Sequence, residues 1–89
     1  MFEVGYLVKS LAGHDKERIY VIVKEQGEYV YLADGKYRTL CTPKRKNKKH
    51  VQLIRCQDEN LTRKLNNQEL IQEEEIKRFI KQYVQLSQS

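Results

Sequence analysis

The chain has 89 residues, with 17 Lys and Arg against 12 Asp and Glu, and therefore a formal charge of +5. A chain of this length forms a single domain that buries only about 60–65% of the surface its unfolded form exposes, so an enclosed active site is disfavoured and we expect a binding module rather than an enzyme. The positive charge indicates a polyanionic partner, either a nucleic acid or an anionic membrane surface.

Three strands are predicted at the start of the chain. The first spans Phe2–Ser10, because its apolar side chains alternate and share one face: Phe2, Val4, Tyr6 and Val8. Gly13 then offers a turn. Ile19–Val23 and Tyr29–Ala33 are rich in β-branched and aromatic residues, and the corner Glu25-Gln26-Gly27 between them is typical of a hairpin.

Two further strands complete the predicted sheet. Asp34-Gly35 is typical of a type I′ turn, so we expect a hairpin from the third strand into Tyr37–Leu40. Pro43 ends this fourth strand, because proline lacks the N–H that a ladder needs, and Val51–Ile54 forms the fifth. Five short strands within residues 1–56 predict a mainly β domain, a small meandering barrel that closes on itself to protect its edges.

Residues 57–89 are predicted to form a C-terminal helical extension. The helix begins at Asn66, because Asn66 and Glu69 have the spacing of a capping box. Its apolar side chains recur on one stripe: Ile76, Phe79, Ile80, Tyr83 and Val84. This stripe either covers an open side of the barrel or binds a partner, which is another protein or a second copy of the chain.

The polar side chains of this extension also follow helical spacing. Glu73 with Lys77 and Glu74 with Arg78 predict ion pairs one turn apart. The acidic start of the helix disfavours binding to a membrane surface. Four further apolar residues are expected to form a first turn that packs differently: Leu61, Leu65, Leu70 and Ile71.

The charge is unevenly distributed along the chain. Residues 1–55 carry 12 basic and 6 acidic side chains, a net +6, whereas residues 56–89 carry 5 and 6, a net −1. Residues 36–49 include seven basic side chains and no acidic one, and five of the seven lie in the predicted loop 43–50. Lysines on a flexible segment contact phosphates as point charges, so we expect this loop to bind a nucleic-acid backbone. The alternatives are a solvated loop that maintains solubility and, for Pro43–Lys46, a nuclear import signal.

Other kinds of site are disfavoured. The longest apolar runs have five residues, whereas a membrane span needs about 20. The N-terminus lacks the pattern of a secretory signal, so we expect a cytoplasmic protein unless a signal was removed before residue 1. Cys41 and Cys56 have no CxxC partner and are expected to be reduced structural thiols, with no metal and no other cofactor. No nucleophile accompanies His14 and Asp15, so we expect no catalysis, and Asp15 is expected to cap backbone amides in its loop.

One stretch resembles a known motif. Residues Gly5–Val23 read GYLVKSLAGHDKERIYVIV, which resembles the strand, Gly-containing polar loop and second strand of the KOW motif. With the later LADGKYRTL and PKRKNKKH, residues 4–54 are similar to small bacterial KOW-domain RNA-binding proteins, relatives of a KOW-containing protein of the archaeal and eukaryotic large ribosomal subunit. The resemblance implies an SH3-like five-stranded barrel that binds RNA, often ribosomal RNA, through the loop after the first strand. The chain departs from the motif at Glu17, where glycine is usual; because glutamate takes a positive backbone angle only at a cost, we expect a different loop conformation.

We therefore predict a ribosome-associated protein that binds RNA, with an SH3-like barrel and an appended C-terminal helix. Tyr37, between Lys36 and Arg38, is the tyrosine expected to stack on a base. The predicted RNA contacts form two groups, around the first loop and on the basic face: Lys9, Ser10, His14, Lys16 and Arg18, and Lys36, Tyr37, Arg38, Lys44, Arg45, Lys46, Lys48, Lys49 and His50. The alternatives are a protein interaction module, since SH3-like barrels also bind peptides, and DNA binding.

Overall fold

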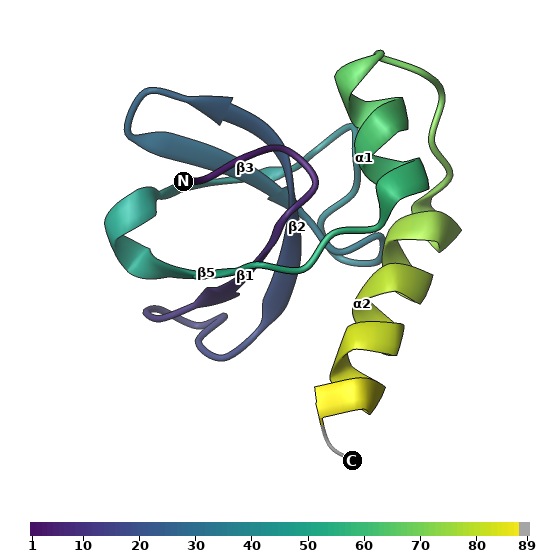
Figure 1. Ribbon diagram of the computed structural model, residues 1–89. Helices are drawn as coiled ribbons and strands as arrows, with labels where there is room; N and C mark the ends of the chain where they lie inside the picture. The colour runs from purple at the N-terminus through teal and green to yellow at the C-terminus, as the bar shows by residue number, and fades with distance from the viewer. Residues whose placement is uncertain (88–89) are drawn as a thin grey trace.

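A computed structural model describes residues 1–87 of the chain. Five strands form one antiparallel sheet in the order β4-β3-β2-β1-β5, and two helices follow it (Figure 1). The strands are β1 (Leu7–Ser10), β2 (Ile19–Gln26), β3 (Tyr29–Ala33), β4 (Lys44–Asn47) and β5 (Val51–Ile54). A 3₁₀ turn, η1 (Lys48–His50), joins β4 to β5, and the helices are α1 (Glu59–Asn66) and α2 (Glu73–Ser87). Within residues 1–87 no ladder joins β4 to β5, so hydrogen bonds do not close the sheet.

Both faces of the sheet are buried, because alternate side chains point to opposite faces. On the inner face, around which the sheet curls, Val8 stands opposite Tyr20 of β2 and Leu53 of β5. The N-terminal residues pack against this cluster, which confirms the face predicted for the first strand: Phe2, Val4 and Tyr6. The regular strand is shorter than predicted, since β1 starts only at Leu7.

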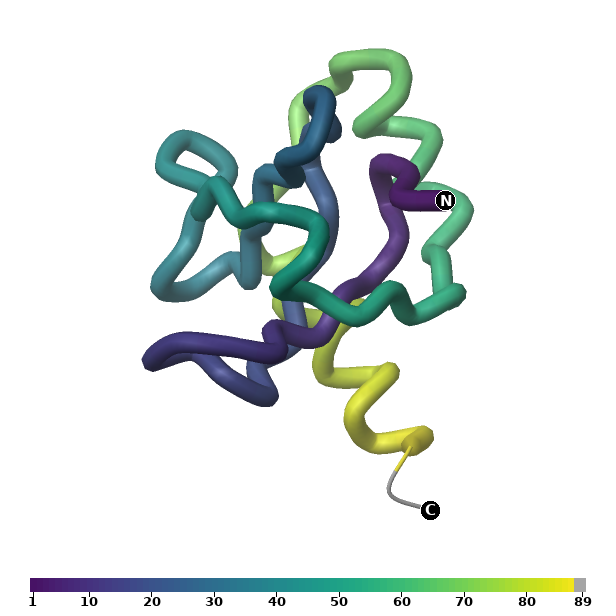
Figure 2. Tube along the Cα trace, turned by 90° about the vertical axis from the view of Figure 1, so that its left-hand side faces the viewer, coloured from purple at the N-terminus to yellow at the C-terminus, as the bar shows by residue number. Residues whose placement is uncertain are grey.

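The two helices cover the other face of the sheet (Figure 1). Leu7 stands opposite Val21 and Ile54 on this face. Leu61 of α1 and two residues of α2, Ile76 and Phe79, are buried against it. The first part of the apolar stripe of α2 therefore packs on the sheet, and burying Ile76 and Phe79 stabilises the fold by roughly 1.5–3 kcal/mol each. The last turns of α2 extend beyond the sheet (Figure 2).

The fourth strand lies elsewhere than predicted. Tyr37–Leu40 is not a strand; Asp34 instead folds the chain into a local loop, since its Oδ1 accepts the N–H groups of Lys36 and Arg38, each at 2.9 Å. An Asp side chain can accept hydrogen bonds from nearby backbone N–H groups, and this arrangement replaces the hydrogen bonds to a neighbouring strand. The chain forms its next strand after Pro43, where β4 pairs antiparallel with β3 and Lys44 is opposite Leu32. Half of the predicted basic loop 43–50 is thus a strand.

The helical extension consists of two helices rather than one. Asn66, predicted to cap the helix, is the last residue of α1, whose N-cap is Asp58 with its Oδ1 accepting the Leu61 N–H at 3.1 Å. Gln68 takes a positive φ of 56°, which ends the first helix as a left-handed residue commonly does. Leu61 and Leu65 do lie in a helix, as their spacing predicts, but in α1.

The predicted ion pairs of α2 are replaced by other contacts. Glu73 accepts the Leu40 N–H at 3.0 Å, and Lys77 Nζ lies 3.8 Å from Glu74. Lys64 of α1 pairs with Glu75 at 2.8 Å and so connects the two helices. In residues 1–87 no helix has the length and apolar character that a bilayer crossing requires.

Candidate nucleic-acid interface

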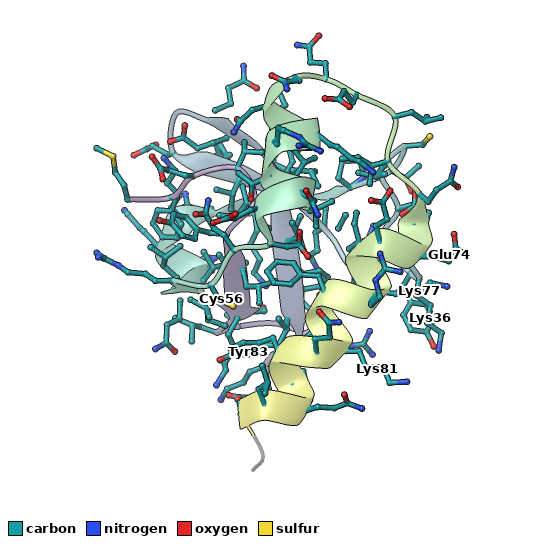
Figure 3. All side chains as sticks on the ribbon, turned by 45° about the vertical axis from the view of Figure 1, so that its right-hand side comes forward. Lys36, Cys56, Glu74, Lys77, Lys81 and Tyr83 are labelled. Atoms are coloured by element: carbon teal, nitrogen blue, oxygen red, sulfur yellow. The ribbon has the colours of Figure 1, made fainter. Side chains whose placement is uncertain are left out.

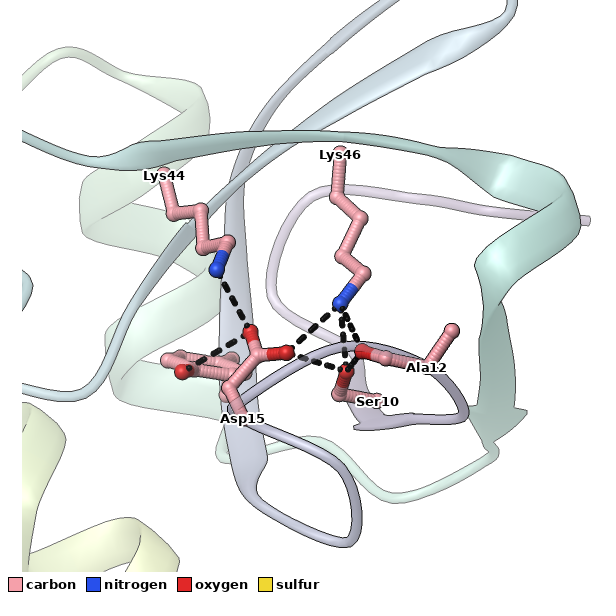
Figure 4. Close-up of polar contacts among 6 residues, drawn as sticks. Ser10, Ala12, Asp15, Lys44 and Lys46 are labelled. Carbon is pink, nitrogen blue, oxygen red and sulfur yellow. Dashed lines mark hydrogen bonds and ion pairs between the residues drawn. The ribbon is translucent and has the colours of Figure 1, made fainter.

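A buried carboxylate ties the loop between β1 and β2 to strand β4. Asp15 Oδ1 accepts hydrogen bonds from Ser10 Oγ at 2.9 Å and from Lys46 Nζ at 2.7 Å (Figure 4). Its Oδ2 accepts the Tyr20 hydroxyl at 3.2 Å and lies 3.0 Å from Lys44 Nζ. Asp15 therefore holds side chains from three strands, whereas its predicted partners were backbone amides.

The charge state of this network follows from its contacts. Burial raises the pKa of Asp15, but the hydrogen bonds from Lys46, Lys44 and Ser10 outweigh it and hold the pKa well below its usual range. Burial, together with the charge and hydrogen bond of Asp15, raises the pKa of Tyr20 to about 12. At neutral pH Asp15 is thus a carboxylate and Tyr20 a neutral phenol.

Three of the predicted RNA contacts belong to this network. Lys46 Nζ also donates to Ser10 Oγ at 2.6 Å and to the Ala12 carbonyl at 2.8 Å, so all three of its donors are used inside the protein. The Lys46 side chain is 9% exposed, and that of Lys44 is 28% exposed. The ammonium groups of Lys44 and Lys46 therefore face Asp15 rather than solvent.

The remainder of the basic stretch differs in accessibility. Lys48 pairs with Glu25 and lies over the Phe2 ring, 5.7 Å from its centroid. Arg45 is exposed, with its guanidinium 4.7 Å from the centroid of Tyr29. Lys49 and His50 are exposed at the 3₁₀ turn. Of the lysines and arginines in 44–49, only Arg45 and Lys49 form no ion pair within the part of the chain that the structure describes.

Backbone hydrogen bonds close the loop 11–18 around Glu17. Glu17 takes a positive φ of 75°, a left-handed angle that glycine adopts more readily than glutamate. Its N–H donates to the Ser10 carbonyl at 2.8 Å, and Ser10 N–H donates to the Arg18 carbonyl at 2.9 Å, which closes the loop. Lys9 lies 3.8 Å from Glu17. The other predicted contacts of this loop are exposed: His14, Lys16 and Arg18.

A shallow groove runs between Tyr37, the end of the first loop and α2; we call it the Tyr37 groove. Arg18 and Lys36 lie 5.4 and 5.0 Å from the centroid of the Tyr37 ring, and Tyr37 is 65% exposed. The groove encloses about 400 Å³. Its lining has an apolar part, four cations and two carboxylates: Ile19, Ile80 and Val84; Arg18, Lys36, Lys77 and Lys81; and Glu17 and Asp34.

The groove depends on the contact between the loop 34–43 and the first turn of α2. Gly35 is buried with φ +79°, and an added Cβ would lie 2.5 Å from the Glu73 carbonyl oxygen, so only glycine allows this approach. Leu40 N–H donates to the Glu73 side chain nearby. The predicted turn Asp34-Gly35 thus docks the loop on α2 and brings Tyr37 and Lys36 beside that helix. Arg38, at the end of this turn, is exposed, and its carbonyl accepts the Asp34 N–H at 2.9 Å.

Sequence reasoning missed the two lysines that α2 contributes. Figure 3 shows Lys77 and Lys81 on α2 along the same edge of the molecule as Lys36. The net −1 of residues 56–89 concealed them, because the acidic residues lie mainly elsewhere on the helices. Their four-residue spacing, shared with Ile80 and Val84, was the available signal that both lysines lie on one side of the helix.

Comparison of the sequence with protein-family models and with curated proteins finds no match. The resemblance to the KOW motif therefore depends on the residues quoted for it. In the described part of the chain, no three His, Cys, Asp or Glu side chains gather closely enough to hold a metal ion.

Proposed function

We propose that this protein is a non-enzymatic, cytoplasmic RNA-binding protein that contacts structured RNA, ribosomal RNA in particular, through the Tyr37 groove. The observation that carries the proposal is the set of four cations around one exposed tyrosine. Backbone phosphates attract such cations, and an exposed aromatic ring offers a stacking surface for bases. The choice of ribosomal RNA follows from the resemblance to KOW-domain proteins.

The proposal includes an SH3-like barrel of the KOW type. Three features support it: β1 pairs with both β2 and β5, the sheet curls around an apolar cluster, and the backbone has a positive φ at Glu17, the position where the motif usually has glycine. In such a protein the loop after the first strand faces RNA. Arg18, at the end of this loop, is the residue that links it to the Tyr37 groove.

A second, smaller surface extends the proposed interface. Arg45, Lys49 and His50 are exposed on β4 and η1, and these three side chains, without Tyr29, are proposed to contact the RNA backbone. The arginine supplies bidentate contacts to phosphate, and the lysine a point charge.

The test compares two variants that lose the same charge at different places. The groove variant changes Arg18, Lys36, Lys77 and Lys81 to Gln. The control variant changes four other exposed cations to Gln: Lys24, Arg55, Arg63 and Arg78. Both variants carry four fewer positive charges, so a difference between them reports location rather than net charge. The probe is a fluorescently labelled hairpin from large-subunit ribosomal RNA, titrated at salt concentrations between 50 and 200 mM.

We expect the wild type and the control variant to bind with a steep dependence on salt. In the groove variant the slope of log affinity against log salt is expected to fall by about 3, because each phosphate contact contributes roughly 0.7–0.9. Equal loss of affinity in both variants would show that only net charge matters, and it would refute the groove as the site. Recovery of protein partners without RNA after crosslinking in cells would favour the interaction-module alternative.

A further inference from the structure

We infer that the Tyr37 groove holds an unpaired base of single-stranded RNA, stacked on the Tyr37 ring with its neighbouring phosphates at the cations of the groove; this inference rests on the proposed function. The ligand class is thus a loop, bulge or single-stranded end rather than a continuous duplex. Three properties of the groove favour this ligand: the exposure of the ring, the ordered loop that carries it and the cations beside it.

Tyr37 is the most exposed of the six tyrosines, all of which lie in the described residues. It is 65% exposed, whereas Tyr29 is 38% exposed and Tyr20 is 2% exposed. Its ring is therefore hardly used to stabilise the fold. An aromatic ring left in water beside cations is typical of a binding surface, and bases stack on such rings because every base has a π face.

The loop that carries Tyr37 is held in place without a ligand. Asp34 Oδ1 accepts the N–H groups on both sides of Tyr37, those of Lys36 and Arg38, at 2.9 Å each. Gly35 packs against the backbone of Glu73 at the start of α2. Because the loop is already ordered, stacking a base on the ring costs little additional conformational entropy.

The charges lie close to the ring on which a base would stack. Arg18 and Lys36 lie over the Tyr37 ring, 5.4 and 5.0 Å from its centroid, so a base that stacks on that face displaces a cation from it, and the displaced cation stays near the RNA backbone. The two lysines of α2 line the same groove. Ile80 and Val84 supply apolar contact for the edge of a base. The groove also contains the carboxylates of Asp34 and Glu17. Asp34 accepts hydrogen bonds from backbone N–H groups, and Glu17 lies 3.8 Å from the ammonium group of Lys9, so each carboxylate already has a partner.

A continuous duplex does not fit this arrangement. In A-form RNA the base faces are stacked inside the helix, and its deep major groove is closed to side chains. A ring that stands between a loop and a helix reaches a base face only when that base is unstacked from its neighbours. The aromatic ring therefore favours single-stranded RNA, whereas the cations alone bind either form.

The test measures binding of a fluorescently labelled single-stranded RNA and of the duplex made from the same sequence. Three variants are compared with the wild type: Tyr37→Leu, Tyr37→Phe and Tyr29→Leu. Tyr29→Leu is the matched control, because Tyr29 is also an exposed tyrosine beside a cation. Both positions are at the surface, so thermal unfolding is expected to remain unchanged and is measured for each of the three variants. A 2-aminopurine base in the single strand reports stacking by loss of its fluorescence.

We expect Tyr37→Leu to lose about five- to a hundredfold in affinity for the single strand and to abolish the quenching. Tyr37→Phe and Tyr29→Leu are expected to remain within about twofold of the wild type, and duplex binding is expected to be unchanged in all variants. If the wild type binds RNA but Tyr37→Leu binds the single strand equally well, the stacking inference is wrong while the proposed function stands. If the wild type binds neither RNA, the proposed function fails as well.

Discussion

The basic stretch 44–49 and the Tyr37 groove contain five and four cations, but they use them differently. In the stretch, Lys44 and Lys46 are held by Asp15, and Lys48 is held by Glu25. In the groove, only Lys77 has a carboxylate within 4 Å among the described residues, and that pair is long and exposed. The stretch therefore mainly stabilises the sheet and its loop, whereas the groove keeps its charge available for a ligand.

The contrast shows that a basic residue in the sequence does not always place its positive charge where a ligand can reach it. The stretch is conspicuous because its cations are consecutive, but β4 places alternate side chains next to Asp15. The groove is inconspicuous because its cations come from three separate segments that meet only in the folded chain. The predictions below test this division of roles, starting with the largest effect.

The largest effect is expected at the centre of the buried network. Asp15→Asn leaves Lys46 with a charge that is 9% exposed and has no counterion, so the free energy of unfolding should fall by about 3–5 kcal/mol. Denaturant unfolding at pH 7 measures this change. Lys49→Gln, in the same stretch but exposed, is the control and should change stability by less than about 0.5 kcal/mol. Similar losses in the two variants would contradict the division within the stretch.

The pH dependence of stability tests the same carboxylate. The pKa of Asp15 in the folded protein lies below its ordinary value of 3.8, so the charged form stabilises the fold above pH 3.8 and this contribution is lost as the pH falls below that value. The stability gap between the wild type and Asp15→Asn is expected to stay constant from pH 7 to about pH 5 and to narrow toward pH 2. A gap that stays constant down to pH 2 would be evidence against an ionised Asp15 in this network.

A smaller effect is expected at Glu17, on the rim of the groove. Glu17→Gly removes a side chain from a left-handed backbone position, φ 75°, and should raise the free energy of unfolding by about 0.5–1 kcal/mol. It also removes a negative charge from the groove, so RNA affinity should rise by about twofold. Glu17→Ala, which loses the charge but keeps the strain, should raise affinity without raising stability. A stability gain of the same size in the alanine variant would contradict the backbone explanation.

Local patterns predicted most of the sheet and part of the site. The strand at 19–23, the strand at 29–33 and the inner face at Val8 follow from side-chain alternation, and the structure confirms them. Tyr37, Lys36 and Arg18 were also among the predicted contacts, and the structure brings them together. The strands are encoded by neighbours in the sequence, whereas the meeting of Arg18 with Tyr37 depends on the fold.

The features that sequence reasoning missed depend mainly on distant contacts. Asp34 draws the chain away from the predicted hairpin through local hydrogen bonds, but the resulting loop is docked by a distant contact, because Gly35 packs against Glu73, 38 positions later. The pairing of Lys46 with Asp15 spans 31 positions and removes a lysine from the surface. Neither contact has a local signature, so the fourth strand was placed too early. Lys77 was predicted only to pair with Glu73, and no role was predicted for Lys81.

The central claim is that RNA binds at the Tyr37 groove rather than at the basic stretch. Backbone-amide NMR shifts, recorded while a single-stranded RNA is added to the isotope-labelled protein, test it most directly. We expect the largest shift changes in residues 17–19, 34–38 and 77–84, with smaller ones at Arg45 and Lys49. Changes confined to residues 44–50, with the groove unaffected, would show that RNA binds at the basic stretch instead.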